Sequence, residues 1–330
     1  MKTRFAPTRR NALKLGLAAS LAAPSIARAQ QGWPPGTITW INPFPAGGGT
    51  DTFARPLAAQ VGEQLGCQII IDNKGGAGGT VGASLAAKAK PDGSVFFVGA
   101  IHHTIAPSIY KSLDYDLEKN FEPITMVALV PQVISINPAK VPAKTYVEFL
   151  AYVKANPGKV NYASPGAGTA HHLAGELFKL ETKTDITHVP YRGAGPAMQD
   201  LLAGNVDMMF DGMGTSATQI KAGKLIGLAV ATPQRVGEFP DIPTAVEIGV
   251  PNWIVSTWYG LWAIKGTPQP IVDRMHAEVV KALANPKLQA IWKDQTAQVG
   301  GESAADFAKR IRAEIEKWQK VVAAAGVKLD

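Results

Sequence analysis

The sequence predicts an α/β protein built from two doubly wound lobes. Three observations lead to this fold class. Short apolar runs alternate with amphipathic stretches, the alternation occurs once before residue 120 and once after it, and glycine-rich loops stand where apolar runs give way to helices. Such alternation is typical of a parallel sheet with helices on both faces. A chain of 330 residues is long enough for two units of this kind.

The first unit is expected to contain three strands and two helices. Phe53, Leu57, Val61 and Leu65 recur four residues apart, which places them on one face of a helix. Cys67 is the only cysteine, so no intramolecular disulfide can form, and we expect it to be a buried small hydrophobe. The expected strands are 38–44, 68–72 and 94–100, and the expected helices are 52–65 and 80–90.

The second unit has the same rhythm without repeating the residues. Apolar runs occur at 124–130 and 132–137; helices are expected at 145–156, 170–180 and 196–203, and strands at 160–163, 187–190, 206–210 and 225–231. A tail helix begins at the capping box of Ser303, and its apolar stripe is expected to be core. The chain is expected to cross between lobes near 120–130 and 250–258. Lobe 1 then comprises 30–127 with 252–330, and lobe 2 comprises 128–251.

Residues 1–29 are predicted to be a signal peptide. Basic residues without acidic ones, a short apolar run at 13–23 and the small-x-small pattern Ala27-Arg28-Ala29 are typical of an export signal. The segment Thr8-Arg9-Arg10-Asn11-Ala12-Leu13-Lys14 resembles a twin-arginine signal. Ala12 stands where a bulky apolar residue is commoner, so an ordinary Sec signal is the alternative. Either route predicts a periplasmic protein, and no later apolar run reaches membrane-spanning length.

The charge balance of the mature chain argues against a nucleic-acid partner. The full chain has 33 basic and 26 acidic residues, a net charge of +7. Six of the basic residues lie in 1–29, which leaves 27 against 26 and a net charge of +1. Binding to nucleic acid needs a basic excess or stripe that engages phosphates. The mature chain shows neither, and we expect a monomer that binds a small molecule.

Three glycine-rich loops stand where a strand precedes a helix. They are Pro45-Ala-Gly-Gly-Gly-Thr-Asp51, Asn73-Lys-Gly-Gly-Ala-Gly-Gly-Thr80 and Ser164-Pro-Gly-Ala-Gly-Thr-Ala170. Backbone N–H groups at such loops and at the following helix N-termini favour anions. Plain turn chemistry, with Asp51 and Thr169 as helix N-caps, is the alternative interpretation. Capping and anion binding are compatible with each other.

The same loops give no sign of a cofactor, a metal or a catalytic site. None has the G-x-G-x-x-G/A or Walker A spacing, so no nucleotide cofactor is expected. No H-E-x-x-H or C-x-x-C motif occurs, and His172 with Glu176 offers a metal only two ligands. Ser164 close to His171 and His172 supports a secreted hydrolase or isomerase as an alternative. Pro165 argues against this hypothesis, because proline lacks the backbone N–H that an oxyanion hole would use.

Several motifs together resemble the Bug family, the periplasmic receptors of tripartite tricarboxylate transporters. They are Pro43-Phe-Pro-Ala-Gly-Gly-Gly-Thr-Asp51, Asp72-Asn-Lys-Gly-Gly-Ala-Gly-Gly-Thr80, Gly168-Thr-Ala-His-His-Leu-Ala-Gly-Glu176, His188-Val-Pro-Tyr-Arg-Gly193, Val206-Asp-Met-Met-Phe-Asp211 and Trp258-Tyr-Gly-Leu261. The resemblance implies a type II periplasmic-binding-protein fold with a ligand cleft between the lobes. It also implies a mono- or dicarboxylate ligand that is delivered to the membrane subunits of such a transporter. A sensory receptor for a membrane kinase is a further alternative.

The resemblance places the ligand between loops of both lobes. It implies contacts from Phe44, Pro45, Ala46, Gly47, Gly48, Asp51 and His102 of the first lobe, and from Ser164, Gly166, Gly168, Thr169, His172, Arg192 and Asp211 of the second. Arg192 has two interpretations, a carboxylate partner or a support behind the 164–170 loop. The chain departs from the family after Asp211, where Gly212-Met-Gly-Thr215 replaces an Asn and a Pro-Ser turn, and at His102-His103. These departures extend the expected ligands to aromatic carboxylates.

Overall fold

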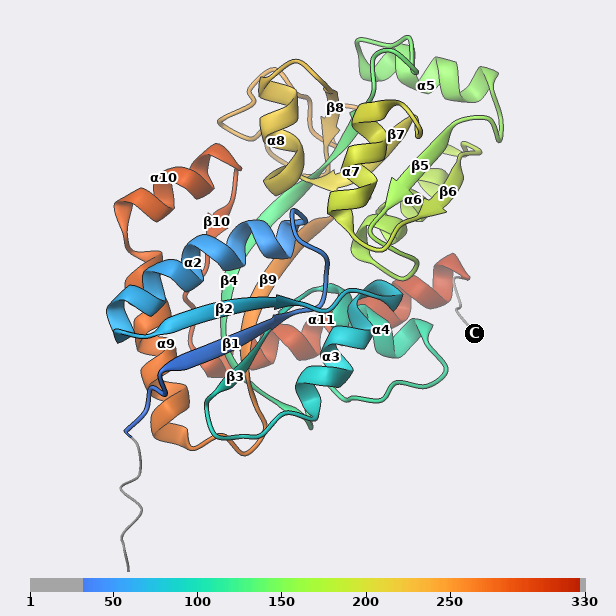
Figure 1. The fold of residues 1–330 in the computed structure, drawn as a ribbon. Helices are drawn as coiled ribbons and strands as arrows, with labels where there is room; N and C mark the ends of the chain where they lie inside the picture. The colour runs from blue at the N-terminus through green and yellow to red at the C-terminus, as the bar shows by residue number, and fades with distance from the viewer. Residues whose placement is uncertain (1–31, 327–330) are drawn as a thin grey trace, which may run out of the picture.

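The computed structural model describes residues 32–326 (Figure 1), so the predicted signal peptide lies outside the described residues. The strands are β1 (Thr37–Asn42), β2 (Gln68–Asn73), β3 (Val95–Ala100), β4 (Phe121–Ile136), β5 (Asn161–Ser164), β6 (Thr187–Pro190), β7 (Met208–Gly212), β8 (Ile226–Val230), β9 (Ser256–Ile264) and β10 (Gln298–Val299). The helices are α2 (Gly49–Leu65), the 3-10 turn η1 (Ala77–Gly79), α3 (Thr80–Ala87), α4 (His102–Ile109), α5 (Tyr146–Ala155), α6 (Ala170–Thr182), α7 (Ala194–Ala203), α8 (Met213–Lys221), α9 (Gln269–Leu283), α10 (Pro286–Asp294) and α11 (Ala304–Ala325). None of the helices within 32–326 is long and apolar enough to cross a membrane.

The strands pair in the order β2-β1-β3-β9-β4-β7-β5-β6, with β8 and β10 also paired to β4. We call β2, β1, β3, β9 and the part of β4 up to Pro131 the first half-sheet. The second half-sheet consists of the rest of β4 with β7, β8, β5 and β6. In Figure 1 the long strand β4 runs through both of them. It is the element that joins the two halves of the molecule.

The sheet is mixed, so the prediction of a parallel sheet was wrong for its centre. β1 is parallel to β2 and β3, and β5 is parallel to β6 and β7, but β9 and β4 run antiparallel to their neighbours. The two apolar runs expected near 124–137 form one strand. Pro131 does not interrupt it, because Pro131 is opposite Ser256 at the point where β4 changes partners from β9 to β7 and β8.

Helices cover both faces of the first half-sheet, as the doubly wound prediction requires. One face packs against α3, α4 and α11, where Trp262 of β9 lies 4.9 Å from Phe307 between ring centroids. The other face packs against α2, α9 and α10 around Phe53 and Trp292. The predicted apolar stripe of the tail helix packs into the core. Cys67, expected to be buried, is only half-buried directly before β2.

The sequence patterns used above indicate no element at α4, α8, α9, α10 or β9. The helix α4 has eight residues and contains Pro107, and α8 begins with Met-Gly-Thr, so neither carries a strong helical pattern. A signal for α9 was available, because Val272, Met275 and Val279 lie at helical spacing and are buried. These unpredicted elements matter for function, because α4 and β9 both supply residues to the candidate functional site.

Candidate functional site

A small cavity lies where the two half-sheets meet. Its lining comes from Phe44, Gly48, Gly49, Thr50, His102 and Tyr259 on one side and from Pro165, His171 and Ala194 on the other. The cavity leaves about 10 Å³ for the centre of a water molecule, room for roughly one water. Apart from Tyr259, which lies within β9, the residues stand at strand ends and helix N-termini, the place where open α/β sheets bind ligands. We call this space the cleft.

The first glycine loop is fixed by Asp51, the third residue of α2. Its carboxylate accepts hydrogen bonds from Arg55 Nε (2.7 Å), the Gly47 N–H (3.0 Å) and Asn73 Nδ2 (3.1 Å). Burial opposes ionisation, but these donors outweigh it and keep the pKa of Asp51 below its usual value. Asp51 is not the N-cap, because Gly48 occupies that position. Asp51 thus ties the loop to α2 and does not line the cleft.

The N-termini of α2 and α7 face each other across the cleft. A Cβ on Gly48 would lie 3.6 Å from the Gly195 nitrogen and 3.7 Å from the Ala194 nitrogen. The same loop makes two further close contacts, since Pro45 packs against Gly193 and against Gly75. The first N–H groups of each helix have no intrahelical acceptor and carry a partial positive charge. Two such helix ends from opposite halves make the cleft favourable for an anion.

The loop 164–169 is held from inside by its own side chains. Thr169 is the N-cap of α6, as predicted; its hydroxyl accepts from the His172 N–H and donates to the Gly166 carbonyl (2.8 Å). The Gly168 N–H donates to His172 Nδ1 (3.1 Å). Ser164 is fully buried, with Oγ 2.6 Å from His188 Nε2. Of these residues none lines the cleft; they shape the loop that does.

The histidine doublet His102-His103 sits at the start of α4, after β3 ends. His102 Nδ1 accepts a hydrogen bond from the Ala170 N–H (3.1 Å), which joins the first half of the molecule to α6 of the second. Burial, with His171 and His103 nearby, keeps the pKa of His102 well below its usual value. The His102 ring is therefore neutral, and because Nδ1 is an acceptor its proton is on Nε2. His103 Nε2 contacts the Gly79 carbonyl (3.4 Å) behind the cleft.

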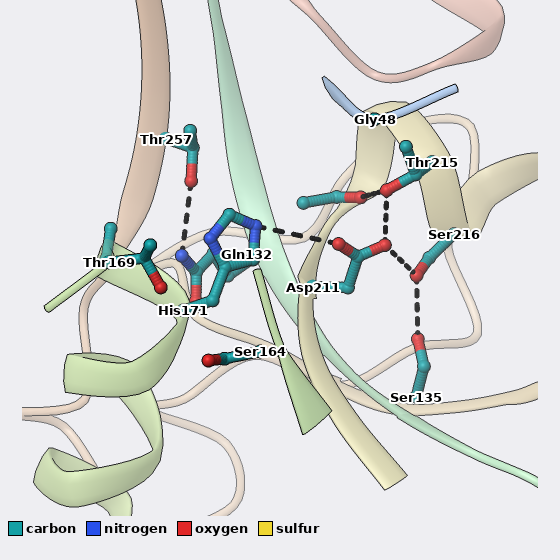
Figure 2. Close-up of polar contacts among 12 residues, drawn as sticks. Gly48, Gln132, Ser135, Ser164, Thr169, His171, Asp211, Thr215, Ser216 and Thr257 are labelled. Carbon is teal, nitrogen blue, oxygen red and sulfur yellow. Dashed lines mark hydrogen bonds and ion pairs between the residues drawn. The ribbon is translucent and has the colours of Figure 1, made fainter. Parts of the chain in front are cut away.

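His171 and Tyr259 line the cleft, although neither was among the expected site residues. His171 Nε2 lies 3.6 Å from Oδ1 of Asp211, which is fully buried behind it (Figure 2). Tyr259 stacks on Phe53 with ring centroids 5.0 Å apart, and its hydroxyl lies over Gly49, where a Cβ would clash. Tyr259 belongs to the motif Trp258-Tyr-Gly-Leu261, which carries part of the family resemblance. Its helical or strand pattern gave no sign that it faces a ligand.

The geometry does not favour the catalytic alternative, and it leaves the role of Arg192 a prediction. The Arg192 side chain is exposed and makes no hydrogen bond or ion pair with the residues described. Ser164 contacts His188 instead of His171 or His172, and burial, followed by the nearby His172 and Lys179, lowers the pKa of His188 to about 3. The Ser164 hydroxyl is also fully enclosed. Within 32–326, no group of three or more His, Cys, Asp or Glu could hold a metal.

Comparisons with known proteins agree with this architecture. The family model described as "Tripartite tricarboxylate transporter family receptor" matches residues 53–327. The periplasmic binding protein BugD is 36% identical, with a TM-score of 0.85 over 88% of this chain and 98% of that one. Rpa4515 of R. palustris, solved with adipate, is 33% identical, with a TM-score of 0.86 over 90% and 99%. MatC of Rhodopseudomonas palustris, solved with bound malate, is 35% identical, with a TM-score of 0.82 over 87% and 98%.

These matches confirm the predicted α/β periplasmic-binding-protein fold, because they cover nearly the whole of each chain at high structural similarity. They also confirm the family that the sequence motifs resembled. The chain belongs to the receptor family of tripartite tricarboxylate transporters, the Bug family of periplasmic solute-binding proteins, whose members bind and are not enzymes.

Proposed function

We propose that this protein captures a small mono- or dicarboxylate in the cleft and delivers it to the membrane subunits of a tripartite tricarboxylate transporter. The observation that carries the proposal is the pair of helix N-termini, α2 and α7, that face each other from opposite halves of the cavity. Two related proteins in this family were solved with adipate and malate, both dicarboxylates. The chain itself is proposed to share that ligand class.

The proposed binding movement is a closure of two lobes, 30–127 with 252–330 and 128–251. A cavity with room for about one water is too small for a C4 diacid. We therefore propose that the lobes separate to admit a ligand, that side chains lining the cavity move aside for it, and that the loops at the rim of the cleft then close again. The bond from Ala170 to His102 and the contact of Gly48 with Ala194 are formed between the lobes, so they break on opening. Export by the twin-arginine signal at 8–14 is proposed to place the protein in the periplasm.

Calorimetric titration of the protein lacking residues 1–29 tests the proposal. The panel contains succinate, malate, glutarate, adipate and benzoate, each paired with the neutral amide of the same skeleton. We expect at least one acid to bind well below the millimolar range and its amide to bind at least tenfold more weakly. If no acid binds below the millimolar range, the proposed function is wrong. A long incubation serves as the control for catalysis, and we expect the ligand to be recovered unchanged.

Delivery to a carrier needs a separate measurement. Cells that express the membrane subunits are expected to accumulate the radiolabelled acid only when this protein is present. The Gly237→Ala variant is a suitable matched control, since Gly237 lies in an exposed turn and nothing stands within 4 Å of the added Cβ. Binding without any stimulated uptake would contradict the transport part of the proposal and leave the binding part intact.

A further inference from the structure

The proposed function makes no use of the buried pair His171 and Asp211. His171 is the second residue of α6, and Asp211 stands near the end of β7. Both side chains are buried, with 4% and 0% of their surface exposed. The ring of His171 lines the cleft, and the carboxylate lies behind the ring (Figure 2). Buried polar groups of this kind are costly unless their hydrogen-bonding atoms are all paired.

Asp211 is held firmly on one of its two oxygens. Oδ2 accepts hydrogen bonds from the Thr215 hydroxyl and from Ser216 Oγ (2.7 Å), and Ser216 accepts one in turn from Ser135 (3.0 Å). Oδ1 has no hydrogen bond from any described residue and faces His171 Nε2 at 3.6 Å (Figure 2). The carboxylate is therefore oriented by its neighbours and directs its free oxygen at the imidazole.

The Nδ1 atom of His171, like Oδ1 of Asp211, is buried and has no hydrogen-bond partner among residues 32–326. The titratable groups that face this ring are Asp211 from β7, His102 from α4, whose ring centroid is 5.4 Å away, and Tyr259 from β9 across the same cavity. His172, the next residue of α6, stacks instead on His188 at 4.0 Å. A buried polar atom left unpaired on a side chain that lines a ligand cavity marks a place where a ligand atom can supply the missing partner.

We infer that the ligand is a dicarboxylate whose second carboxylate is bound by His171 Nδ1, and that one proton enters the cleft with it. This inference rests on the proposed function. A carboxylate at Nδ1 and Asp211 at Nε2 both require a donated hydrogen bond. Neutral imidazole has one N–H, and only the imidazolium has two. The ring between two carboxylates therefore binds a proton when the ligand binds.

His102 is placed to bind the same carboxylate of the ligand as His171. Its Nδ1 is occupied by the Ala170 N–H, so its single proton is on Nε2. This nitrogen forms no hydrogen bond with a described residue, and its ring lines the cavity beside His171. The second carboxylate would then accept one bond from each histidine, one from each half of the protein. The first carboxylate is left to the N-termini of α2 and α7.

Titration calorimetry in several buffers tests the inference. The probes are succinate, glutarate and adipate, each compared with the monoacid of equal length, butyrate, valerate or hexanoate. At pH 8, where an ordinary histidine is neutral, phosphate, HEPES and Tris differ in ionisation enthalpy. The slope of the observed enthalpy against that value gives the protons taken up. We expect about one proton per diacid, none per monoacid, and a diacid affinity at least tenfold above that of its monoacid.

Variants assign the effect to this pair. His171→Gln and Asp211→Asn should each abolish the proton uptake, and His171→Gln should reduce the preference for diacids to less than threefold. His276→Gln is the matched control, because the His276 ring lies on α9 outside the cleft and contacts the Glu302 carbonyl. This substitution should change neither quantity. Thermal melting confirms that each variant is folded; if His171→Gln is not, Asp211→Asn decides.

Two results would overturn the inference. One is diacid binding to the wild-type protein without proton uptake at pH 8. The other is a folded variant of either residue that keeps the full uptake. Both leave the proposed function standing, since they require that an acid binds. Binding of no acid at all contradicts the proposed function itself and removes the inference with it.

Discussion

Replacing Gly195 with alanine should weaken ligand binding while the fold stays intact. Gly195 is the second residue of α7, and a Cβ on it would lie 2.7 Å from the Ala46 carbonyl oxygen and 3.4 Å from the Gly47 carbonyl carbon. Both are backbone atoms, which cannot turn aside as the end of a side chain can. The α7 N-terminus and the 43–48 loop must therefore separate by roughly 0.5–1 Å in the closed protein.

Gly195→Ala is expected to weaken ligand binding but to raise the free energy of unfolding. Overpacking at a contact of this kind costs about 1–3 kcal/mol, which raises Kd roughly 5- to 150-fold. Gly195 does not have a positive φ, so alanine fits its helical backbone. The substitution then removes freedom from the unfolded chain and stabilises the fold by roughly 0.5–1 kcal/mol. Opening of the lobes relieves the contact, so the penalty falls on a closed form in which the α7 N-terminus lies against the 43–48 loop, as we propose for the ligand-bound protein.

Calorimetric titration with the tightest acid of the panel, together with thermal unfolding, checks both signs. Gly237→Ala is the matched control, because it lies in an exposed turn with nothing within 4 Å of the added Cβ. We expect Gly195→Ala to bind more weakly with an equal or higher Tm, and Gly237→Ala to bind as the wild type does. Affinity of Gly195→Ala within twofold of the wild type would refute closure through this contact.

Three further predictions concern single side chains. Asp51→Asn should lower the free energy of unfolding by about 1–2 kcal/mol at pH 7; because the pKa of Asp51 is lowered in the folded state, the gap to wild type should close as the pH falls below 4 in urea unfolding. His188, whose pKa is lowered to about 3 by burial and then by His172 and Lys179, takes up a proton on unfolding below pH 6.5. Stability should therefore fall by about 1.4 kcal/mol per pH unit for this group between pH 6 and 4, and His188→Gln should flatten the curve by that amount. Arg192→Ala should change ligand affinity by less than about 0.5 kcal/mol, and a larger loss in titration would restore Arg192 as a carboxylate partner.

Much of the local structure could be predicted because it depends on neighbours in sequence. The αL glycine that ends α7, Gly204, and the N-caps Thr169 and Ser303 stand where the residue types require them. The direction of β4 could not be predicted. Its apolar pattern is the same in a parallel and in an antiparallel pair, and only the partners β9, β7 and β8 decide between them.

The glycine loops show a second limit of prediction from sequence. The loop 73–80 was expected to favour an anion like the other two glycine loops, but none of its residues lines the cleft. A Cβ on Gly79 would meet the Phe44 ring at 2.9 Å, and one on Gly78 would meet the Ala167 carbonyl oxygen at the same distance. The close approach explains why glycine stands at these positions. It is a contact between segments about 35 and 90 residues apart, which no local pattern reveals.

In each of the two histidine doublets, one residue lines the cleft and the other contacts a glycine loop. This difference decides which substitutions test ligand recognition in the cleft. Successive residues on a helix point about 100° apart, so one member of each doublet faces the cleft and the other faces inward. His102 and His171 line the cavity, whereas His103 contacts the Gly79 carbonyl and His172 accepts from Gly168. Substitution of an inward member alters a glycine loop and therefore affects every ligand alike. Substitution of an outward member removes a group that the ligand itself meets, so only there should the preference between diacid and monoacid change.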